Sequence, residues 1–370
     1  MALCTSCRRK SPTISKALFL CADCIRSSFP EVGAKLQQVH RLSRLEFGLS
    51  PHPPKHAGGR VCEMCANSCR IGPGEMGFCG VRKNEGGRLL GGSSPARAHV
   101  EWYYDPLPTN CVADWVCPGG SNCGFPEFSH SPSPEYGYEN LAVFFQACTM
   151  NCLFCQNWHF RQIRFESPWR GVEELVASLR EKTSCICYFG GDPSAQMPFA
   201  LEASRRALER RNGRILRICW ETNGMMSWKF LEEALALSLE TGGCVKFDLK
   251  AWTKEMSVAL CGTSNERTLD NFTRASRFAE KRKAFPLIVA STLLVPGYVD
   301  EQEVGGLSRF IAGLDRAIPY SLLGFHPNFL MSDLPATSRR HAYRAREIAE
   351  GAGLQNVRIG NLHVLGDDYE

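Results

Sequence analysis

The residues best suited to chemistry are three cysteines in a short segment that follows an apolar run. Cys148, Cys152 and Cys155 have the spacing Cys-x3-Cys-x2-Cys. Three thiolates can hold three corners of a cubane [4Fe-4S] cluster and leave the fourth iron open to a substrate or cofactor. We therefore predict that these three cysteines bind a catalytic cluster.

Four cysteines near the N-terminus form two close pairs. Cys4, Cys7, Cys21 and Cys24 have the spacing Cys-x2-Cys-x13-Cys-x2-Cys, which is typical of a zinc ribbon. Four thiolates complete the coordination of zinc, so such a site has no open position for chemistry and serves structure or partner docking. Free surface thiols are the alternative interpretation.

A third group lies in a segment rich in Gly, Pro and Cys. Cys62, Cys65, Cys69 and Cys79 have the spacing Cys-x2-Cys-x3-Cys-x9-Cys. Bound metal can order a segment that has no apolar core of its own. We predict zinc at this group, with an auxiliary iron–sulfur cluster as the alternative.

The other cysteines give weaker signals. Cys111, Cys117 and Cys123, spaced Cys-x5-Cys-x5-Cys, are either ligands of an auxiliary cluster near the active site or ordinary loop thiols. The last five lie in or near apolar runs, and we expect them to be buried small hydrophobes. They are Cys185, Cys187, Cys219, Cys244 and Cys261.

Composition narrows the class of protein. The chain has 370 residues, 19 cysteines and a formal net charge of +5, too small and too evenly spread to indicate a nucleic-acid or membrane surface. No apolar run approaches the roughly 18 residues of a membrane span, and the N-terminal residues have no apolar signal core. We expect a cytoplasmic protein whose cysteines bind metal rather than form disulfides.

The elements that would position the three cysteines begin after residue 140. Short apolar runs alternate there with helical patterns such as Val172, Leu175, Val176 and Leu179, which predicts strand–helix units around a parallel sheet. Six or seven units are too few for an eight-fold barrel, so we expect an α/β fold, a partial (β/α)6 TIM-type barrel. An open doubly wound sheet is the alternative. The expected strands are 141–146, 185–189, 215–220, 245–249, 287–295, 320–325 and 357–359.

These patterns divide the chain into three parts. Residues 1–50 are expected to form a zinc-ribbon-like module, 61–140 a metal-stapled insert and 141–366 the barrel, with a linker rich in Pro and Gly between the first two. Ser227 and Thr337 are expected to be N-caps of later helices.

Polar motifs follow the expected strands, and strand ends of such folds carry reactive groups. Paired glycines let backbone approach a ligand, carboxylates accept from an ammonium or a ribose hydroxyl, and a lysine can meet a carboxylate. The alternatives are a plain turn at the glycines, a solvated pair at Asp248 and Lys250, and a core histidine at His326. The candidate residues are Gly190, Gly191, Asp192, Pro193, Glu221, Thr222, Asn223, Asp248, Lys250 and His326.

With Phe154 before the third cysteine, this arrangement resembles the radical S-adenosylmethionine (SAM) superfamily. Residues 61–365 are similar to its pyruvate formate-lyase activating enzyme-like and AmmeMemoRadiSam-type members, through Phe-Cys-Gly-Val-Arg at 78–82, Gln156-Asn157 and Gly-Gly-Asp-Pro at 190–193. The resemblance implies that Phe154 and the strand-end residues contact SAM. It also implies reductive cleavage of SAM to a 5'-deoxyadenosyl radical that abstracts hydrogen from a substrate, with a flavodoxin or ferredoxin as electron donor.

Three functions are compatible with these patterns. The first is a radical SAM enzyme acting on an unidentified substrate. The second is activation of a glycyl-radical enzyme. The third is a non-catalytic metal-binding adaptor, against which the intact cysteine triplet and the polar strand ends argue.

Overall fold

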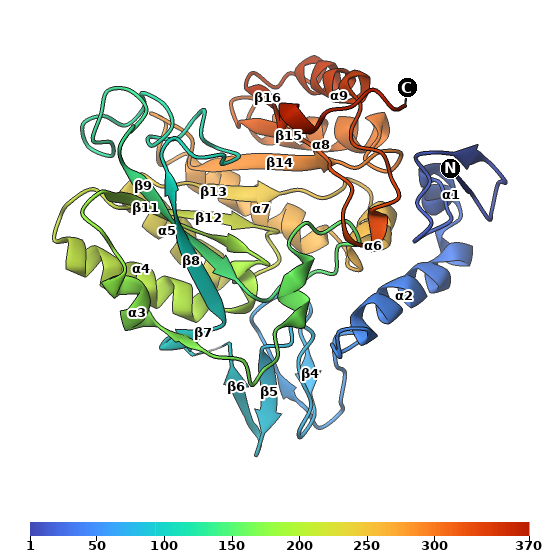
Figure 1. Ribbon diagram of the computed structural model, residues 1–370, viewed down its shortest axis with the longest axis horizontal. Helices are drawn as coiled ribbons and strands as arrows, with labels where there is room; N and C mark the ends of the chain where they lie inside the picture. The colour runs from blue at the N-terminus through green and yellow to red at the C-terminus, as the bar shows by residue number, and fades with distance from the viewer. Residues whose placement is uncertain (93, 370) are drawn as a thin grey trace.

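The computed structural model describes residues 1–92 and 94–369. An eight-stranded sheet lies at its centre, and the strands follow one another in space in the order in which they occur along the chain (Figure 1). All neighbours are parallel except the first pair, which is antiparallel. The strands are β8 (Val100–Pro106), β9 (Glu139–Phe145), β11 (Thr183–Gly190), β12 (Arg217–Thr222), β13 (Val245–Asp248), β14 (Ile288–Leu294), β15 (Tyr320–Gly324) and β16 (Val357–Gly360).

Helices cover the outer face of this sheet. Side chains alternate between the two faces of a strand, and the outward ones, such as Tyr188, Trp220 and Val245, pack in the main apolar core. The inward ones line the barrel interior. The helices are α3 (Val172–Ala177), α4 (Met197–Arg211), α5 (Trp228–Thr241), α6 (Lys254–Cys261), α7 (Glu266–Ala279), α8 (Glu301–Leu314) and α9 (Arg339–Gly351).

The predicted parallel α/β barrel is confirmed, since each of the seven expected strands overlaps one observed strand. Two expectations need correction. β8 lies inside the predicted insert 61–140, so the sheet begins at Val100 and not after residue 140. α9 is capped by Ser338, which accepts from the His341 N–H, whereas the Thr337 hydroxyl donates to Leu294 O. Ser227 does precede α5 as predicted.

Residues 107–137, between β8 and β9, fill part of the barrel interior. Glu135 forms a buried ion pair with Arg217 of β12, at 2.5 Å. On the other side, Asp114 pairs with Arg358 of β16 at 2.6 Å, and Trp115 donates to Ser321 of β15. The segment therefore connects a central strand of the sheet to the two strands at its β16 edge, and we call it the plug.

The N-terminal residues form a small module on the outside of the barrel. It contains β1 (Ala2–Leu3), β2 (Lys10–Ser11), α1 (Ala22–Ser27) and α2 (Phe29–Leu45), and it lies beside α6 (Figure 1). Ser15 N donates to the Tyr298 hydroxyl and Lys16 N to Asp333, while Arg26 pairs with Asp300. We call this module the ribbon.

The remaining elements are short. Two antiparallel hairpins, β3 with β4 and β5 with β6, order the insert, and β7 pairs with β10. No helix among the described residues has the length and apolar character needed to cross a bilayer. The bounds are β3 (Arg60–Val61), β4 (Arg70–Ile71), β5 (Arg82–Glu85), β6 (Arg88–Gly91), β7 (Arg97–Ala98), β10 (Arg170–Gly171), η1 (Trp158–Gln162), η2 (Pro193–Ala195), η3 (Phe329–Met331) and η4 (Leu362–Val364).

Candidate active site

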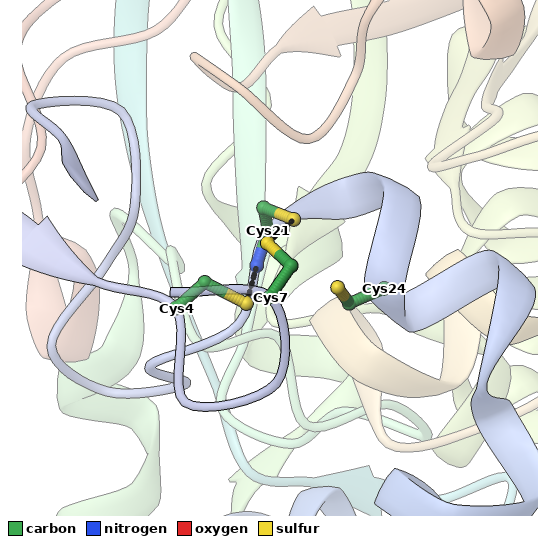
Figure 2. A group of neighbouring side chains, drawn as sticks. All are labelled: Cys4, Cys7, Cys21 and Cys24. Atoms are coloured by element: carbon green, nitrogen blue, oxygen red, sulfur yellow. Dashed lines mark hydrogen bonds between the residues drawn. The ribbon is translucent and has the colours of Figure 1, made fainter. Parts of the chain in front are cut away.

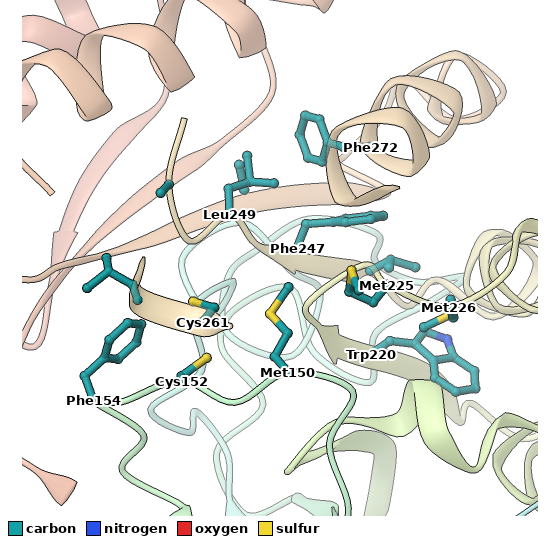
Figure 3. Packing of buried hydrophobic residues seen from close by; sticks show 14 of the residues in the cluster. Met150, Cys152, Phe154, Trp220, Met225, Met226, Phe247, Leu249, Cys261 and Phe272 are labelled. Atoms are coloured by element: carbon teal, nitrogen blue, oxygen red, sulfur yellow. The ribbon is translucent and has the colours of Figure 1, made fainter. Parts of the chain in front are cut away.

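The three predicted cluster cysteines lie in the loop that follows β9. Met150 and Phe154, which alternate with them, are buried in the core near Leu249 of the barrel (Figure 3). The Cys152 sulfur points toward Cys261 at the end of α6 (Figure 3). Burying the apolar residues of this loop holds the cysteines at the carboxyl end of the sheet.

The two glycines after β11 hold this loop by backbone contact. Gly191 N donates to Phe145 O at 2.8 Å, and Asp192 N donates to Ala147 O at 2.7 Å. A Cβ on Gly191 would overlap the Ala147 carbonyl, and Gly190 has φ +107° with its Cβ position 2.6 Å from Phe145 N. The glycines are therefore required for the close approach of two loops, before any ligand is considered.

The carboxylate of Asp192 is occupied by protein groups. It accepts from Ser194 N at 2.8 Å and Asn223 N at 2.6 Å, and from the Thr222 hydroxyl at 3.1 Å. Burial raises the pKa of Asp192, and these donors oppose that effect. Asn223 in turn donates to the Cys148 sulfur at 3.7 Å. Asp192 therefore connects the end of β12 to the glycine pair.

A buried arginine lies behind the triplet. Arg161 donates from Nη2 to Cys152 O at 3.2 Å and to Asn151 Oδ1 at 3.4 Å. Its Nε and Nη1 are buried and have no hydrogen-bond partner among the described residues. A buried cation without a partner is costly, and thiolate ligands would supply the missing negative charge. The cysteines and their surroundings thus fit an anionic [4Fe-4S] cluster.

The loop opens into a large cavity at the carboxyl ends of the strands. Its volume is about 730 Å³, which lies within the roughly 300–1,000 Å³ of a typical small-molecule site. Twelve predicted residues line it: Cys148, Cys152, Phe154, Cys155, Gly190, Gly191, Asp192, Glu221, Thr222, Asn223, Asp248 and Lys250. The cavity therefore has the size of a small-molecule binding site.

Asp248 and Lys250 form an ion pair in this cavity. Burial alone lowers the pKa of Lys250, but the charges of Asp248 and the neighbouring Cys152 raise it well above its usual value. Asp248 Oδ1 is buried and has no partner among the described residues. It is therefore an acceptor available to the hydroxyl or ammonium group of a ligand.

Two predicted residues lie outside the cavity lining. His326 was expected in the pocket, but its side chain is exposed and its Nδ1 lies 3.1 Å from Pro327 O. The chain turns outward after β15, because Phe325 N donates to the Thr337 hydroxyl and fixes the strand end. Pro193 is buried at the start of η2.

The sequence left open whether Cys111 lies near the active site, and it gave no indication of the other residues that the plug contributes. Asn110, Cys111, Asp114 and Trp115 line the cavity opposite the cysteine triplet. The only signal for them was the Cys-x5-Cys-x5-Cys spacing, which does not indicate where the segment folds. Residues 360–363 also line the cavity, whereas Asp333 accepts from Ser15 of the ribbon and Leu330 N donates to Leu153 O of the cysteine loop.

The four cysteines of the ribbon converge on one point (Figure 2). Their sulfurs all lie within 4.8 Å of one another, and those of Cys7 and Cys21 are 3.7 Å apart. A tetrahedral zinc site places its sulfurs about 3.8 Å apart. In the part of the chain that the structure describes, no other group of three or more potential ligands is as compact.

The four cysteines of the insert lie beside the cysteine loop that follows β9. Cys62, Cys65, Cys69 and Cys79 line one small cavity together with Thr149, and Asn67 Nδ2 donates to Thr149 O at 2.8 Å. Arg82 lines this cavity too, and its Nε and Nη2 have no partner among the described residues. This buried cation fits a thiolate metal centre.

Comparison with known proteins agrees with this geometry. Residues 142–305 match the family model of the Radical SAM superfamily. An uncharacterized protein of Methanocaldococcus jannaschii, MJ0808, is 26% identical over 309 residues, which covers 81% of each chain. The pyruvate formate-lyase 1-activating enzyme of Escherichia coli K12 is 26% identical over 196 residues, 50% of this chain and 75% of the relative.

A third relative is the isethionate sulfite-lyase activating enzyme of Oleidesulfovibrio alaskensis. It is 32% identical over 144 residues, which are 38% of this chain and 41% of the relative. Residues 142–305 thus match a radical SAM domain, and the chain is similar to two activating enzymes. The match to that family model implies a [4Fe-4S] cluster and SAM as cofactors, together with a reductant and a substrate.

Proposed function

We propose that the protein cleaves SAM reductively at a cluster held by Cys148, Cys152 and Cys155, and that it uses the resulting radical to abstract hydrogen from a substrate. When bound and reduced, the cluster supplies the electron that releases methionine and a 5'-deoxyadenosyl radical. One observation carries the proposal: the triplet and the polar strand ends line a single cavity of about 730 Å³, the size of a small-molecule site.

The protein's own residues would bind and orient the ligands. Asp248 Oδ1 offers a free acceptor to a hydroxyl or ammonium group, and Lys250 lies beside it to meet a carboxylate. Phe154 closes the apolar side of the cavity. We propose that Asp192 and Asn223 act by positioning, since Asp192 orders the strand end and Asn223 reaches the Cys148 sulfur.

The test is anaerobic reconstitution with iron and sulfide, followed by dithionite and SAM. The parent protein should form 5'-deoxyadenosine, and Cys152→Ala should not. Cys123→Ala is the matched control, because the Cys123 sulfur lies in the plug beside Ser121 and Val116 O, outside the cavity lining. A Cys152→Ala variant that cleaves SAM as well as the parent would contradict the proposal.

A second candidate is activation of another enzyme by hydrogen abstraction from its backbone glycine. It is favoured by the names of two relatives, the activating enzymes of pyruvate formate-lyase 1 and isethionate sulfite-lyase. Anaerobic incubation with a candidate lyase would distinguish it, since activation leaves a protein-borne radical visible by electron paramagnetic resonance. The non-catalytic adaptor is not retained, because the chain matches the Radical SAM family model and is similar to activating enzymes.

The cysteine groups of the ribbon and of the insert are proposed to bind metal ions that take no part in catalysis. Zinc at the ribbon is supported by the mutual proximity of its four sulfurs. For the insert group we propose zinc, with an iron–sulfur cluster as the alternative. The alternative is supported by the spacing of the four insert sulfurs, which, among the described residues, do not all lie within 4.8 Å of one another. A flavodoxin or ferredoxin is proposed as the electron donor. Metal analysis of Cys24→Ala and Cys65→Ala would identify each ion.

A further inference from the structure

A second cavity lies deeper in the barrel, toward the amino ends of the strands. Its volume is about 110 Å³. Six cysteines line it: Cys111, Cys117, Cys185, Cys187, Cys219 and Cys244. They come from the plug and from three neighbouring strands or their starts, so the fold gathers thiols that are far apart in the sequence.

Three of these thiols form a row across the sheet. Cys187 and Cys219 are register partners on β11 and β12. Cys244 lies next to Cys219, because Trp220 pairs with Val245 and donates its N–H to Cys244 O at 3.0 Å. The three pack in one buried cluster. The expectation that they are buried is confirmed, but they line a cavity instead of merely filling the core.

The plug supplies the opposite wall of this cavity. Cys111 and Cys117 pack against the row of three cysteines. Among the described residues, the Cys117 sulfur makes one long hydrogen bond, at 4.0 Å to Asp114 O. Cys123 of the same plug is different, since its sulfur accepts from the Ser121 hydroxyl at 3.2 Å and lies 3.4 Å from Val116 O. Together with Cys185, these thiols make six that line one space, and Cys123 is not among them.

A buried lysine makes sulfur contacts that point to a charged occupant. Lys246 Nζ lies 3.2 Å from the Cys111 sulfur, 3.1 Å from the Cys187 sulfur and 3.2 Å from Glu221 Oε1. Its ammonium group has three N–H donors, and two of them are directed at sulfur. A neutral thiol is a weak acceptor, whereas a metal-bound thiolate is anionic and binds an ammonium group strongly. Glu221 supplies one counter-charge to the lysine, and the two N–H groups directed at sulfur are placed to donate to thiolate ligands.

We propose that this cavity binds an iron–sulfur cluster, with ligands drawn from Cys111, Cys117, Cys187, Cys219 and Cys244. A cluster fits better than a single ion. Neighbouring strands are about 4.8 Å apart, so the outer members of the row lie roughly 9–10 Å apart at Cα. A zinc ion needs sulfurs about 3.8 Å apart, whereas a cluster binds each cysteine to a separate iron.

The proposed cluster would be adjacent to the catalytic cavity. Cys111, Glu221 and Lys246 line both cavities and form the wall between them. A substrate in the upper cavity would therefore lie between SAM and the deeper cluster. Cys185 is left out of the ligand set, because its thiol donates to Asn140 Oδ1 at 3.2 Å.

The test removes the catalytic cluster first. In full-length protein, Cys148, Cys152 and Cys155 are replaced together by alanine, and the variant is reconstituted anaerobically with iron and sulfide. We expect it to keep about two to four iron atoms per chain. Adding Cys219→Ala or Cys117→Ala should remove that iron, as measured by iron and sulfide analysis and by Mössbauer spectroscopy.

Two matched variants separate this site from its neighbours. Cys123→Ala in the same background should leave the iron unchanged, and Cys65→Ala reports any iron held by the insert. Zinc content and circular dichroism check folding, and Cys117→Ala in the plug stands in if Cys219→Ala does not fold. Iron that persists in both Cys219→Ala and Cys117→Ala, or zinc in place of iron, would overturn the proposal. Because the catalytic triplet is absent from the test, its outcome is independent of SAM cleavage.

Discussion

The ribbon and the cysteine loop that follows β9 both bring cysteines together, but they are built differently. In the ribbon, four sulfurs from a stretch of 21 residues (4–24) converge within 4.8 Å. In the cysteine loop that follows β9, the three cysteines depend on groups from distant parts of the chain, including Gly191 and Asn223. A closed site can be specified locally, whereas an open reactive site needs a framework that holds it from outside.

The largest effect should come from replacing a single cysteine by alanine at each of these two sites. Cys152→Ala should lower SAM cleavage at least ~100-fold, about 3 kcal/mol in activation free energy, and leave zinc at the ribbon. Cys24→Ala should lose zinc and keep the catalytic iron. Iron and zinc analysis together with the 5'-deoxyadenosine assay measures both. Loss of both metals in either variant would show that the two sites are not separate.

A variant of the plug shows whether this segment is anchored to the barrel by its buried ion pair. Glu135 and Arg217 are both almost fully buried and pair at 2.5 Å. Burial raises the pKa of Glu135, but hydrogen bonds and charge from Arg217 outweigh it and lower that pKa. Glu135→Gln leaves a buried cation unpaired, and we expect it to lower the free energy of unfolding by about 3–5 kcal/mol.

Urea unfolding of the Glu135→Gln variant measures this effect. The exposed pair Arg346 and Glu350, one turn apart on α9, is the control, and Glu350→Gln should cost no more than about 0.5 kcal/mol. Equal effects of the two variants would mean that the plug is not anchored by its buried pair.

A smaller effect on stability is expected when the contact between the glycine pair and the cysteine loop is disturbed. A Cβ at Gly191 would overlap the Ala147 carbonyl, so Gly191→Ala should lower the free energy of unfolding by about 1–3 kcal/mol and also lower SAM cleavage. Gly313→Ala in α8, where nothing lies within 4 Å of the Cβ position, should instead be neutral or stabilise slightly. Retained SAM cleavage in Gly191→Ala would contradict the proposed positioning.

Much of this framework could be predicted from sequence, because its signals are periodic. The strands of the barrel and the polar residues at their ends follow from alternating apolar runs. The spacing of Cys4, Cys7, Cys21 and Cys24 likewise predicted a compact group, and the sulfurs do converge.

What could not be predicted depends on contacts between distant segments. β8 has alternating burial but lies among Gly, Pro and Cys, so no pattern marked it as part of the sheet. The row of Cys187, Cys219 and Cys244 exists only once strand register is known. His326 follows a strand as a pocket residue would, yet the turn after Phe325 exposes it.

The smallest effect on stability should come from weakening the contact that attaches the ribbon to the barrel. The Tyr298 hydroxyl accepts from Ser15 N at 2.9 Å and donates to Leu20 O at 3.0 Å, so Tyr298→Phe leaves two ribbon groups without this partner. We expect a loss of about 1 kcal/mol in the free energy of unfolding, with zinc content and SAM cleavage unchanged. Tyr343→Phe, on the exposed face of α9, should change stability by less than about 0.5 kcal/mol. If Tyr298→Phe also released zinc, the ribbon would depend on the barrel for its metal site, and the contrast between the two cysteine sites would be wrong.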